Sequence, residues 1–396
     1  MPTALPIIDG DGHFVEPVGL WSEYVPSSMR DRIHAITGAD GYMESLVLGD
    51  HVRDYRPRPH PFDKGDTLRP GGLRPGQTLG RRYEDAEPGG WNATRRLAVH
   101  DAENIVAAVL FPTLGLQLGS LADADVALTA CQAINRWAAD YAAAAPGELH
   151  VVASLPDHFP SLAAAELRRC VEEHGFVAAA MRPNPTVDGR RLDHPDFEVV
   201  WQTAVDLDVP VCIHDVGALD RPQLGADRSA NFLVQHAAIH SFEGMMAFAT
   251  LYQGEVFTRH PTLRVGFMES GCGWAPFWVE RLHEHAKGLG WLIDPPAQRD
   301  PAEIFATQCV VTCEGEESMV PYVQERLGDQ SVLWASDFPH FDTEPPFSAD
   351  IVNRTDMTDR QREAVLHGAA TAFYRLDWDH IRERNASRRG VALAAR

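Results

Sequence analysis

Four side chains that suit a metal ion follow apolar segments far apart in the sequence. Asp11 and His13 are two residues apart, so in extended backbone both point to the same side. His214 ends a second apolar segment, and Asp337 follows a third. Two imidazoles and two carboxylates form a mixed nitrogen and oxygen ligand set that suits Zn²⁺, Mn²⁺ or Fe²⁺. We therefore predict one divalent metal ion, with Zn²⁺ as the first choice and Mn²⁺ or Fe²⁺ as alternatives.

Each of these residues has another interpretation when it is taken alone. Asp11 and His13 also fit a turn that the aspartate caps, and His214 also fits a structural histidine at the rim of a sheet. Asp337 follows a buried strand directly, and a carboxylate there needs a cation or hydrogen-bond donors because burial of an unpaired charge is costly. The combination of all four favours a metal site.

The hydrophobic pattern predicts a scaffold that brings these residues together. Short apolar runs alternate with segments of helical periodicity, which is typical of β/α units and a parallel sheet. The predicted fold class is α/β, a (β/α)8 TIM-like barrel with a long insertion after strand 1, whose catalytic groups lie at the carboxyl ends of the strands. The expected strands are 6–9, 105–111, 151–155, 176–181, 209–213, 263–268, 309–312 and 331–335. The expected helices are 123–145, 161–173, 197–207, 242–258, 275–286, 320–327 and 358–376.

The barrel is expected to form a single domain over residues 1–376. Residues 38–98 are rich in Gly, Pro and Arg and are predicted to form an insertion, either a lid that borders the site or an arm that packs on a neighbouring subunit. Residues 377–396 are predicted to form a C-terminal tail whose last ten residues fray.

Composition excludes several classes of function. The chain has 35 Lys and Arg against 56 Asp and Glu, and its net charge of −21 disfavours nucleic acid and anionic membrane surfaces as partners. No apolar run approaches the roughly 20 residues of a membrane-spanning helix, and no signal peptide is evident. The six cysteines are scattered, which favours reduced thiols and a cytoplasmic location. We expect a small-molecule substrate.

The chain resembles the amidohydrolase superfamily, in the branch typified by aminocarboxymuconate-semialdehyde decarboxylase and resorcylate-type decarboxylases. The resemblance runs from residue 7 to about residue 376 and includes 201–214, 257–264 and the Ser-Asp-Phe-Pro-His segment at 336–340. It implies a single-metal (β/α)8 enzyme that forms homo-oligomers, here a dimer. His13 matches the second histidine of the family's His-x-His motif, and Asp11 stands in place of the first. His214 and Asp337 match the ligands of the fifth and eighth strands.

One strand departs from the family's pattern. Relatives usually end the sixth strand with a histidine, whereas this chain has Glu269 there. Its carboxylate is predicted to ligate the metal or to act as an acid/base, and a salt bridge to a nearby arginine is the alternative. His240 is a further candidate catalytic residue or substrate contact.

Three more residues are predicted to bind substrate. Arg182 and Asn184 follow the fourth strand, and an arginine there suits a substrate carboxylate. Helix capping or an ion pair at the rim explains both equally well. His340 is predicted to contact substrate or to orient Asp337.

Three functional hypotheses follow from this site. The main one is a metal-dependent hydrolase, in which the ion activates a water molecule, Asp337 takes its proton, and Asp337 or Glu269 protonates the leaving group. The alternative is a metal-dependent, non-oxidative decarboxylase of an aromatic or unsaturated carboxylic acid. The third is an inactive barrel that acts as a binding protein.

Overall fold

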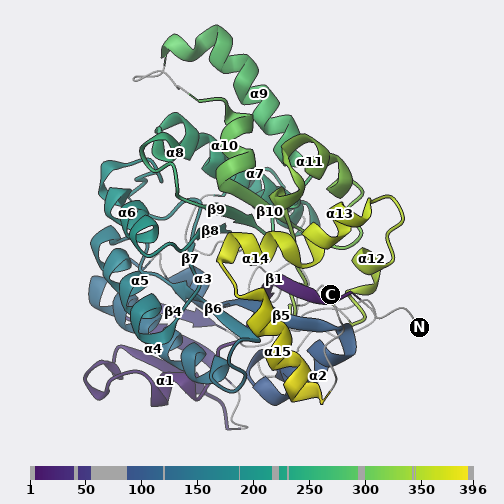
Figure 1. Ribbon diagram of the computed structural model, residues 1–396. Helices are drawn as coiled ribbons and strands as arrows, with labels where there is room; N and C mark the ends of the chain where they lie inside the picture. The colour runs from purple at the N-terminus through teal and green to yellow at the C-terminus, as the bar shows by residue number, and fades with distance from the viewer. Residues whose placement is uncertain are drawn as a thin grey trace.

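A nearly closed barrel of parallel strands surrounded by helices forms the body of the protein (Figure 1). The computed structural model describes residues 5–39, 43–54, 87–118, 121–186, 188–215, 223–229, 232–292, 299–340, 343 and 345–390. The eight strands pair in the order β1-β5-β6-β7-β8-β9-β10-β11, and each of these neighbouring pairs is parallel. They are β1 (Ile7–His13), β5 (Ile105–Phe111), β6 (Leu149–Ser154), β7 (Ala178–Met181), β8 (Val211–His214), β9 (Val265–Met268), β10 (Cys309–Cys313) and β11 (Val332–Trp334). The predicted (β/α)8 barrel is confirmed.

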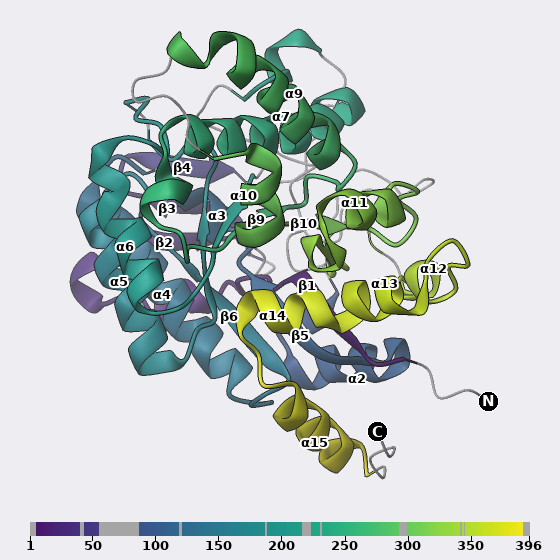
Figure 2. The ribbon, with the colours of Figure 1, turned by 45° about the horizontal axis from the view of Figure 1, so that its top comes forward.

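Helices follow the strands and cover the outside of the barrel (Figures 1 and 2). Each of the expected helices is present. Helix α7 begins ten residues before its predicted start, because apolar residues occur all around it and its sequence therefore shows only a weak amphipathic pattern. The α-helices are α1 (Leu20–Glu23), α2 (Ala93–Glu103), α3 (Gly115–Leu118), α4 (Ala124–Ala142), α5 (Pro160–His174), α6 (Glu198–Asp206), α7 (Phe232–Gln253), α8 (Val256–Arg259), α9 (Trp274–Leu289), α10 (Pro301–Gln308), α11 (Val320–Leu327), α12 (Ala349–Val352), α13 (Asp359–Glu363), α14 (Ala369–Tyr374) and α15 (Trp378–Arg389). Shorter turns are η1 (Ser27–Met29), η3 (Pro88–Gly90), η4 (Pro195–Phe197), η5 (Ala226–Arg228), η6 (Gly290–Leu292), η7 (Asp329–Ser331) and the π-helical η8 (Ala364–Gly368).

The hydrophobic core has two layers. The larger cluster lies between the strands and the outer helices, and a smaller one, which includes Val109, Val152 and Leu333, fills the barrel interior. Helix α14 covers the amino ends of the strands, where Phe373 packs into the interior cluster and its carbonyl accepts a hydrogen bond from Arg264 at 2.9 Å. One end of the barrel is therefore filled, which leaves the carboxyl ends of the strands for chemistry.

The segments predicted as insertion and tail contain regular structure in their described parts. Strands β2 (Ile33–Thr37), β3 (Met43–Leu48) and β4 (His51–Asp54) form a separate antiparallel sheet, and α2 closes the insertion. Residues 55–86, the centre of the predicted insertion, lie outside the described residues, so its role as a lid or arm stays a prediction. The predicted tail begins with α15, whose Ile381 is buried, and residues 391–396 lie outside the described part.

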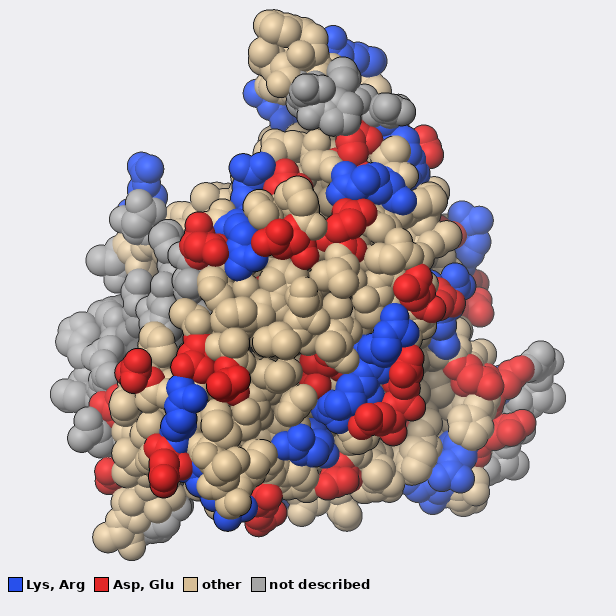
Figure 3. Space-filling model, turned by 90° about the vertical axis from the view of Figure 1, so that its left-hand side faces the viewer, with Lys and Arg blue, Asp and Glu red and all other residues tan. Residues whose placement is uncertain are grey.

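Acidic and basic side chains are interspersed over the surface, as Figure 3 shows for one face. The net charge of −21 is therefore not concentrated on that face. Among the helices that the structure describes, none has the length and apolar character needed to cross a membrane.

The buried Arg96 of α2 joins the two strands that close the barrel. Its guanidinium donates hydrogen bonds to the carbonyl of His13, at the end of β1, and to the carbonyl of Phe338 after β11, at 3.2 Å. A third bond reaches the carbonyl of Gly89 at 3.2 Å, and the guanidinium lies 4.8 Å from the centre of the Phe338 ring. Sequence reasoning missed this residue, because nothing local marks an arginine as buried.

We predict that Arg96→Met destabilises the fold by about 3 kcal/mol, because three buried hydrogen bonds from a charged donor to backbone carbonyls are lost. Urea denaturation measures this free energy. Arg95→Met is the matched control: its side chain is largely exposed, and its effect should stay within about 0.5 kcal/mol. Equal stability of the two variants would contradict the role of Arg96.

Candidate metal centre

The four predicted metal ligands come from three strands and fall into two groups that share His13. The ligand atoms of Asp11, His13 and His214 lie within 4.8 Å of one another, and Asp337 forms such a group with His13, Glu269 and His340. Asp11 Oδ1 is 3.7 Å from His13 Nε2 and 3.8 Å from His214 Nε2. Asp337 Oδ1 is 3.2 Å from His13 Nε2. All four side chains are buried.

Backbone contacts between the ends of β1 and β11 fix this arrangement. The amide of Asp337 donates to the carbonyl of Asp11 at 3.1 Å, and the amide of His13 donates to the carbonyl of Phe338 at 2.8 Å. Gly10 allows the close approach, because a Cβ atom there would lie 3.1 Å from the Cβ of Leu333. The contacts between the ends of β1 and β11 therefore also bring Asp337 close to His13.

The ligand atoms themselves suit a bound cation. Among the described residues, Asp11 Oδ1, His13 Nε2 and His214 Nε2 are buried and have no hydrogen-bond partner. The other ring nitrogens are engaged: His13 Nδ1 lies 3.2 Å from the carbonyl of Pro112, and His214 Nδ1 lies 2.7 Å from that of Asp215. Carbonyl contacts of this kind orient a histidine so that Nε2 faces a metal. A divalent ion would satisfy all three atoms, each of which otherwise costs about 1–3 kcal/mol.

Burial sets the protonation of these groups. It lowers the pKa of His13 well below its usual value, and it lowers the pKa of His214 to about 3. It raises the pKa of the Asp11 carboxyl well above its usual value, with the nearby Asp9 carboxyl adding to the shift. The imidazoles are therefore neutral, which is the form that binds metals, and a cation would offset the cost of the charged carboxylate.

The buried Asp9 carboxylate supports the candidate metal centre through Ser336. It accepts hydrogen bonds from the amide of Ser336 at 3.0 Å and from its hydroxyl at 2.5 Å. Both contacts hold the segment that carries Asp337. On the other side, His340 Nδ1 lies 2.8 Å from Asp337 Oδ1, so His340 contacts the predicted base directly.

Glu269 lies beside the centre and contacts a second group of histidines. Its Oε2 is 3.8 Å from His214 Nε2, and its Oε1 is 3.5 Å from His240 Nε2 and 3.8 Å from His236 Nε2. These three contacts are all with histidines, and the predicted salt bridge to an arginine stays an alternative. Sequence reasoning gave His236 no role. The spacing of four residues from His240 was the available signal.

The predicted substrate-binding residues lie next to the centre. Arg182 is buried and pairs with Asp215 at 3.5 Å, and its NH2 group lies 3.4 Å from Asn184 Oδ1. Its Nε is buried without a hydrogen-bond partner among the described residues. Gln223 donates to the other Asp215 oxygen at 2.6 Å. This network directly adjoins His214, the residue before Asp215.

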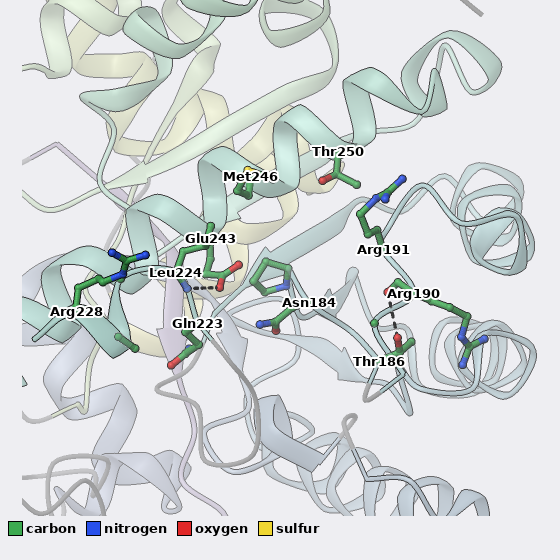
Figure 4. A pocket seen from close by; sticks show the side chains of 14 residues that line it. Asn184, Thr186, Arg190, Arg191, Gln223, Leu224, Arg228, Glu243, Met246 and Thr250 are labelled. Carbon is green, nitrogen blue, oxygen red and sulfur yellow. Dashed lines mark hydrogen bonds between the residues drawn. The ribbon is translucent and has the colours of Figure 1, made fainter. Parts of the chain in front are cut away.

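A cavity of about 670 Å³ lies beside this network. Figure 4 shows Asn184, Gln223 and Glu243 on one side of it, and Arg190 and Arg191 on the other. Glu243 comes from α7, one turn after His240. The cavity is large enough for a small organic molecule.

Comparison with known proteins identifies the family. The amidohydrolase family profile matches residues 8–376. The chain belongs to this family. It is similar to the gamma-resorcylate decarboxylase of Polaromonas sp., with 24% identity over 72% of this chain and 86% of the relative. It is also similar to the 2-amino-3-carboxymuconate-6-semialdehyde decarboxylase of Dictyostelium discoideum, with 24% identity over 75% and 80% of the two chains.

A solved structure shows the same fold. The dihydroxybenzoic acid decarboxylase of Polaromonas sp., with bound manganese and 2-nitroresorcinol, superimposes with a TM-score of 0.64, at 19% identity over 94% of this chain and 97% of that one. The chain is thus an enzyme of the amidohydrolase family, in the branch that the residues indicated. The comparisons favour the decarboxylase alternative over the hydrolase expectation, and the residue roles stay predictions.

We predict that His214→Ala abolishes metal binding, because it removes a buried imidazole from the centre. Asp337→Asn should keep part of the metal but lose turnover, since the amide cannot carry the proton. Elemental analysis and calorimetry measure the metal, and a folded His51→Ala variant, altered on the exposed β4, is the control. A His214→Ala variant with its full metal content would exclude this residue as a ligand.

Proposed function

We propose that the protein is a metal-dependent, non-oxidative decarboxylase of a small aromatic carboxylic acid. The observation that carries the proposal is the convergence of Asp11, His13, His214 and Asp337 on one buried centre, in a chain whose relatives along most of its length are named decarboxylases. Hydrolysis would use the same centre, but the named relatives give it no support.

The side chains around the centre fit an aromatic acid. Phe111 lies with its ring centre 6.0 Å from that of His13 and 5.4 Å from that of His214, which gives the site an apolar wall. Arg182, which is buried and pairs with Asp215 at 3.5 Å, directly precedes Pro183 and Asn184, two residues that line the cavity. A bound divalent ion supplies a Lewis acid that fixes and polarises the oxygens of the acid.

Asp337 is the proposed proton donor. It transfers its proton to the ring carbon that bears the carboxylate. The bond between that carbon and the carboxylate then breaks, and its electron pair restores the aromatic ring as CO₂ leaves. His340, at 2.8 Å, is placed to return a proton to Asp337. No oxidant is required, since the electrons stay on the ring.

The identity of the ion is also part of the proposal. The sequence favoured Zn²⁺, whereas the manganese in the Polaromonas enzyme supports Mn²⁺ as well. Two carboxylates and two imidazoles accept either ion. We propose a divalent ion of this group, loaded in the cytoplasm, where the six buried free cysteines stay reduced.

The decarboxylation is tested with the metal-loaded enzyme and a panel of dihydroxybenzoates. We expect stoichiometric CO₂ and phenol, and in D₂O one deuterium at the carbon that lost the carboxylate. Asp337→Asn, with its metal content measured, should lose at least about 100-fold in rate, as expected for a general acid. Hydrolysis of ester or amide substrates without CO₂ from any acid would overturn the proposal.

We also propose that the chain forms a homodimer through α9. This helix projects from the top of the molecule in Figure 1, and the same projection stands at the top of Figure 3. Large apolar side chains that are exposed near one another mark interaction sites, and three of those below lie within residues 289–292. The large exposed ones on α9 and η6 are Phe277, Leu289, Trp291 and Leu292.

Light scattering after size-exclusion chromatography tests the dimer. A Trp291→Glu/Leu292→Glu variant should run as a monomer, because charges at these positions would be buried in the interface. The control, Val199→Glu, alters an exposed apolar residue of α6 and should leave the mass unchanged. A monomeric wild-type protein at micromolar concentration would exclude this interface.

A further inference from the structure

Helix α7 presents two histidines to Glu269 outside the four-residue centre. His236 and His240 are one turn apart, so they share a face of the helix, and their ring centres are 4.7 Å apart. Both Nε2 atoms face the same oxygen, Glu269 Oε1, at 3.8 and 3.5 Å. The ligand atoms of the three residues lie within 4.8 Å of one another.

The Glu269 carboxylate separates this group from the first centre. Its Oε1 faces α7, whereas its Oε2 faces His214 Nε2 at 3.8 Å. The residue has a left-handed backbone with φ of 46°, and its amide donates to Thr312 Oγ1 at 2.8 Å. A carboxylate held with one oxygen toward each of two ligand groups has the orientation of a bridging ligand in two-metal sites, where the ions are about 3.5–4 Å apart.

His240 is placed as a ligand of a buried ion. Its side chain is 8% exposed, and its Nε2, the proposed ligand atom, faces Glu269 Oε1 at 3.5 Å. Two imidazoles and one carboxylate form a ligand set that binds Zn²⁺ in hydrolytic enzymes and Fe²⁺ in oxygenases. Helix α7 also lines the cavity, through Glu243, Met246 and Thr250.

The charge of the site gives a second argument. This argument rests on the proposed function, because it assumes a carboxylic acid substrate. Asp11, Asp337 and Glu269 bring three carboxylates to a buried region. With Asp337 protonated as the proposed proton donor, one divalent ion leaves this group with no net positive charge, so the group gives an anionic substrate no net attraction at short range. Two divalent ions make it positive, and Arg182 is already paired with Asp215.

We propose that His236, His240 and Glu269 bind a second divalent cation, and that Glu269 bridges it to the ion held by Asp11, His13, His214 and Asp337. The second ion adds a positive charge between the first centre and the cavity. It therefore selects for substrates that carry an additional anionic oxygen, such as a phenolate or a second carboxylate.

The number of bound ions tests this proposal directly. Metal-free enzyme is titrated with Mn²⁺, and the bound metal is counted by equilibrium dialysis and elemental analysis. We expect the wild type to bind two ions per chain and to give the electron paramagnetic resonance signal of two coupled Mn²⁺ ions. The His236→Ala/His240→Ala variant should bind one ion and give an uncoupled signal. His285→Ala, on the exposed face of α9, should keep both ions.

Two results would overturn the proposal: saturation of the wild type at one uncoupled Mn²⁺ per chain, or two ions in the double variant. The wild-type measurement stands even where the double variant fails to fold. One ion together with CO₂ release would remove the second site and leave the decarboxylase intact. Two coupled ions without CO₂ release from any acid would support the second site and overturn the proposed decarboxylase activity.

Discussion

The structure depends on a group of buried ligand atoms that the protein alone leaves unsatisfied. Asp11 Oδ1, His13 Nε2 and His214 Nε2 face one another without hydrogen-bond partners among the described residues. Such atoms are costly to bury, and the cost is accepted where a cation completes their coordination. The supporting contacts are complete by contrast: both histidines are oriented by carbonyls, and Asp337 is held by the backbone of Asp11.

Closure of the barrel and assembly of the centre are one event. The ends of β1 and β11 meet through backbone hydrogen bonds, and the buried Arg96 bonds to carbonyls on both. Asp9 holds Ser336 from below. Mutations at these positions act on the metal through geometry, because none of the three side chains faces the common centre of the ligand atoms.

Glu269 lies between the two groups of histidines, with Oε2 toward His214 and Oε1 toward His240. A histidine at the end of the sixth strand would be neutral and would face one centre, whereas the carboxylate adds a charge and can face two. The same charge makes an anionic substrate harder to bind near Asp11 and Asp337 with one ion alone. Decarboxylation and the second ion are therefore connected by electrostatics, although separate experiments decide them.

The sequence by itself determined the barrel, and it predicted the four residues that the metal centre is proposed to use. Strands that are covered on both faces read as continuous apolar runs, and the carboxyl ends of parallel strands meet at one edge, so the positions of Asp11, His214 and Asp337 followed from order alone. Only the tertiary structure placed Arg96 inside the barrel seam and His236 beside Glu269. Each contact joins two segments that are far apart in the sequence. The distance between such segments depends on how the outer helices pack on the strands, and a local sequence pattern does not predict that packing.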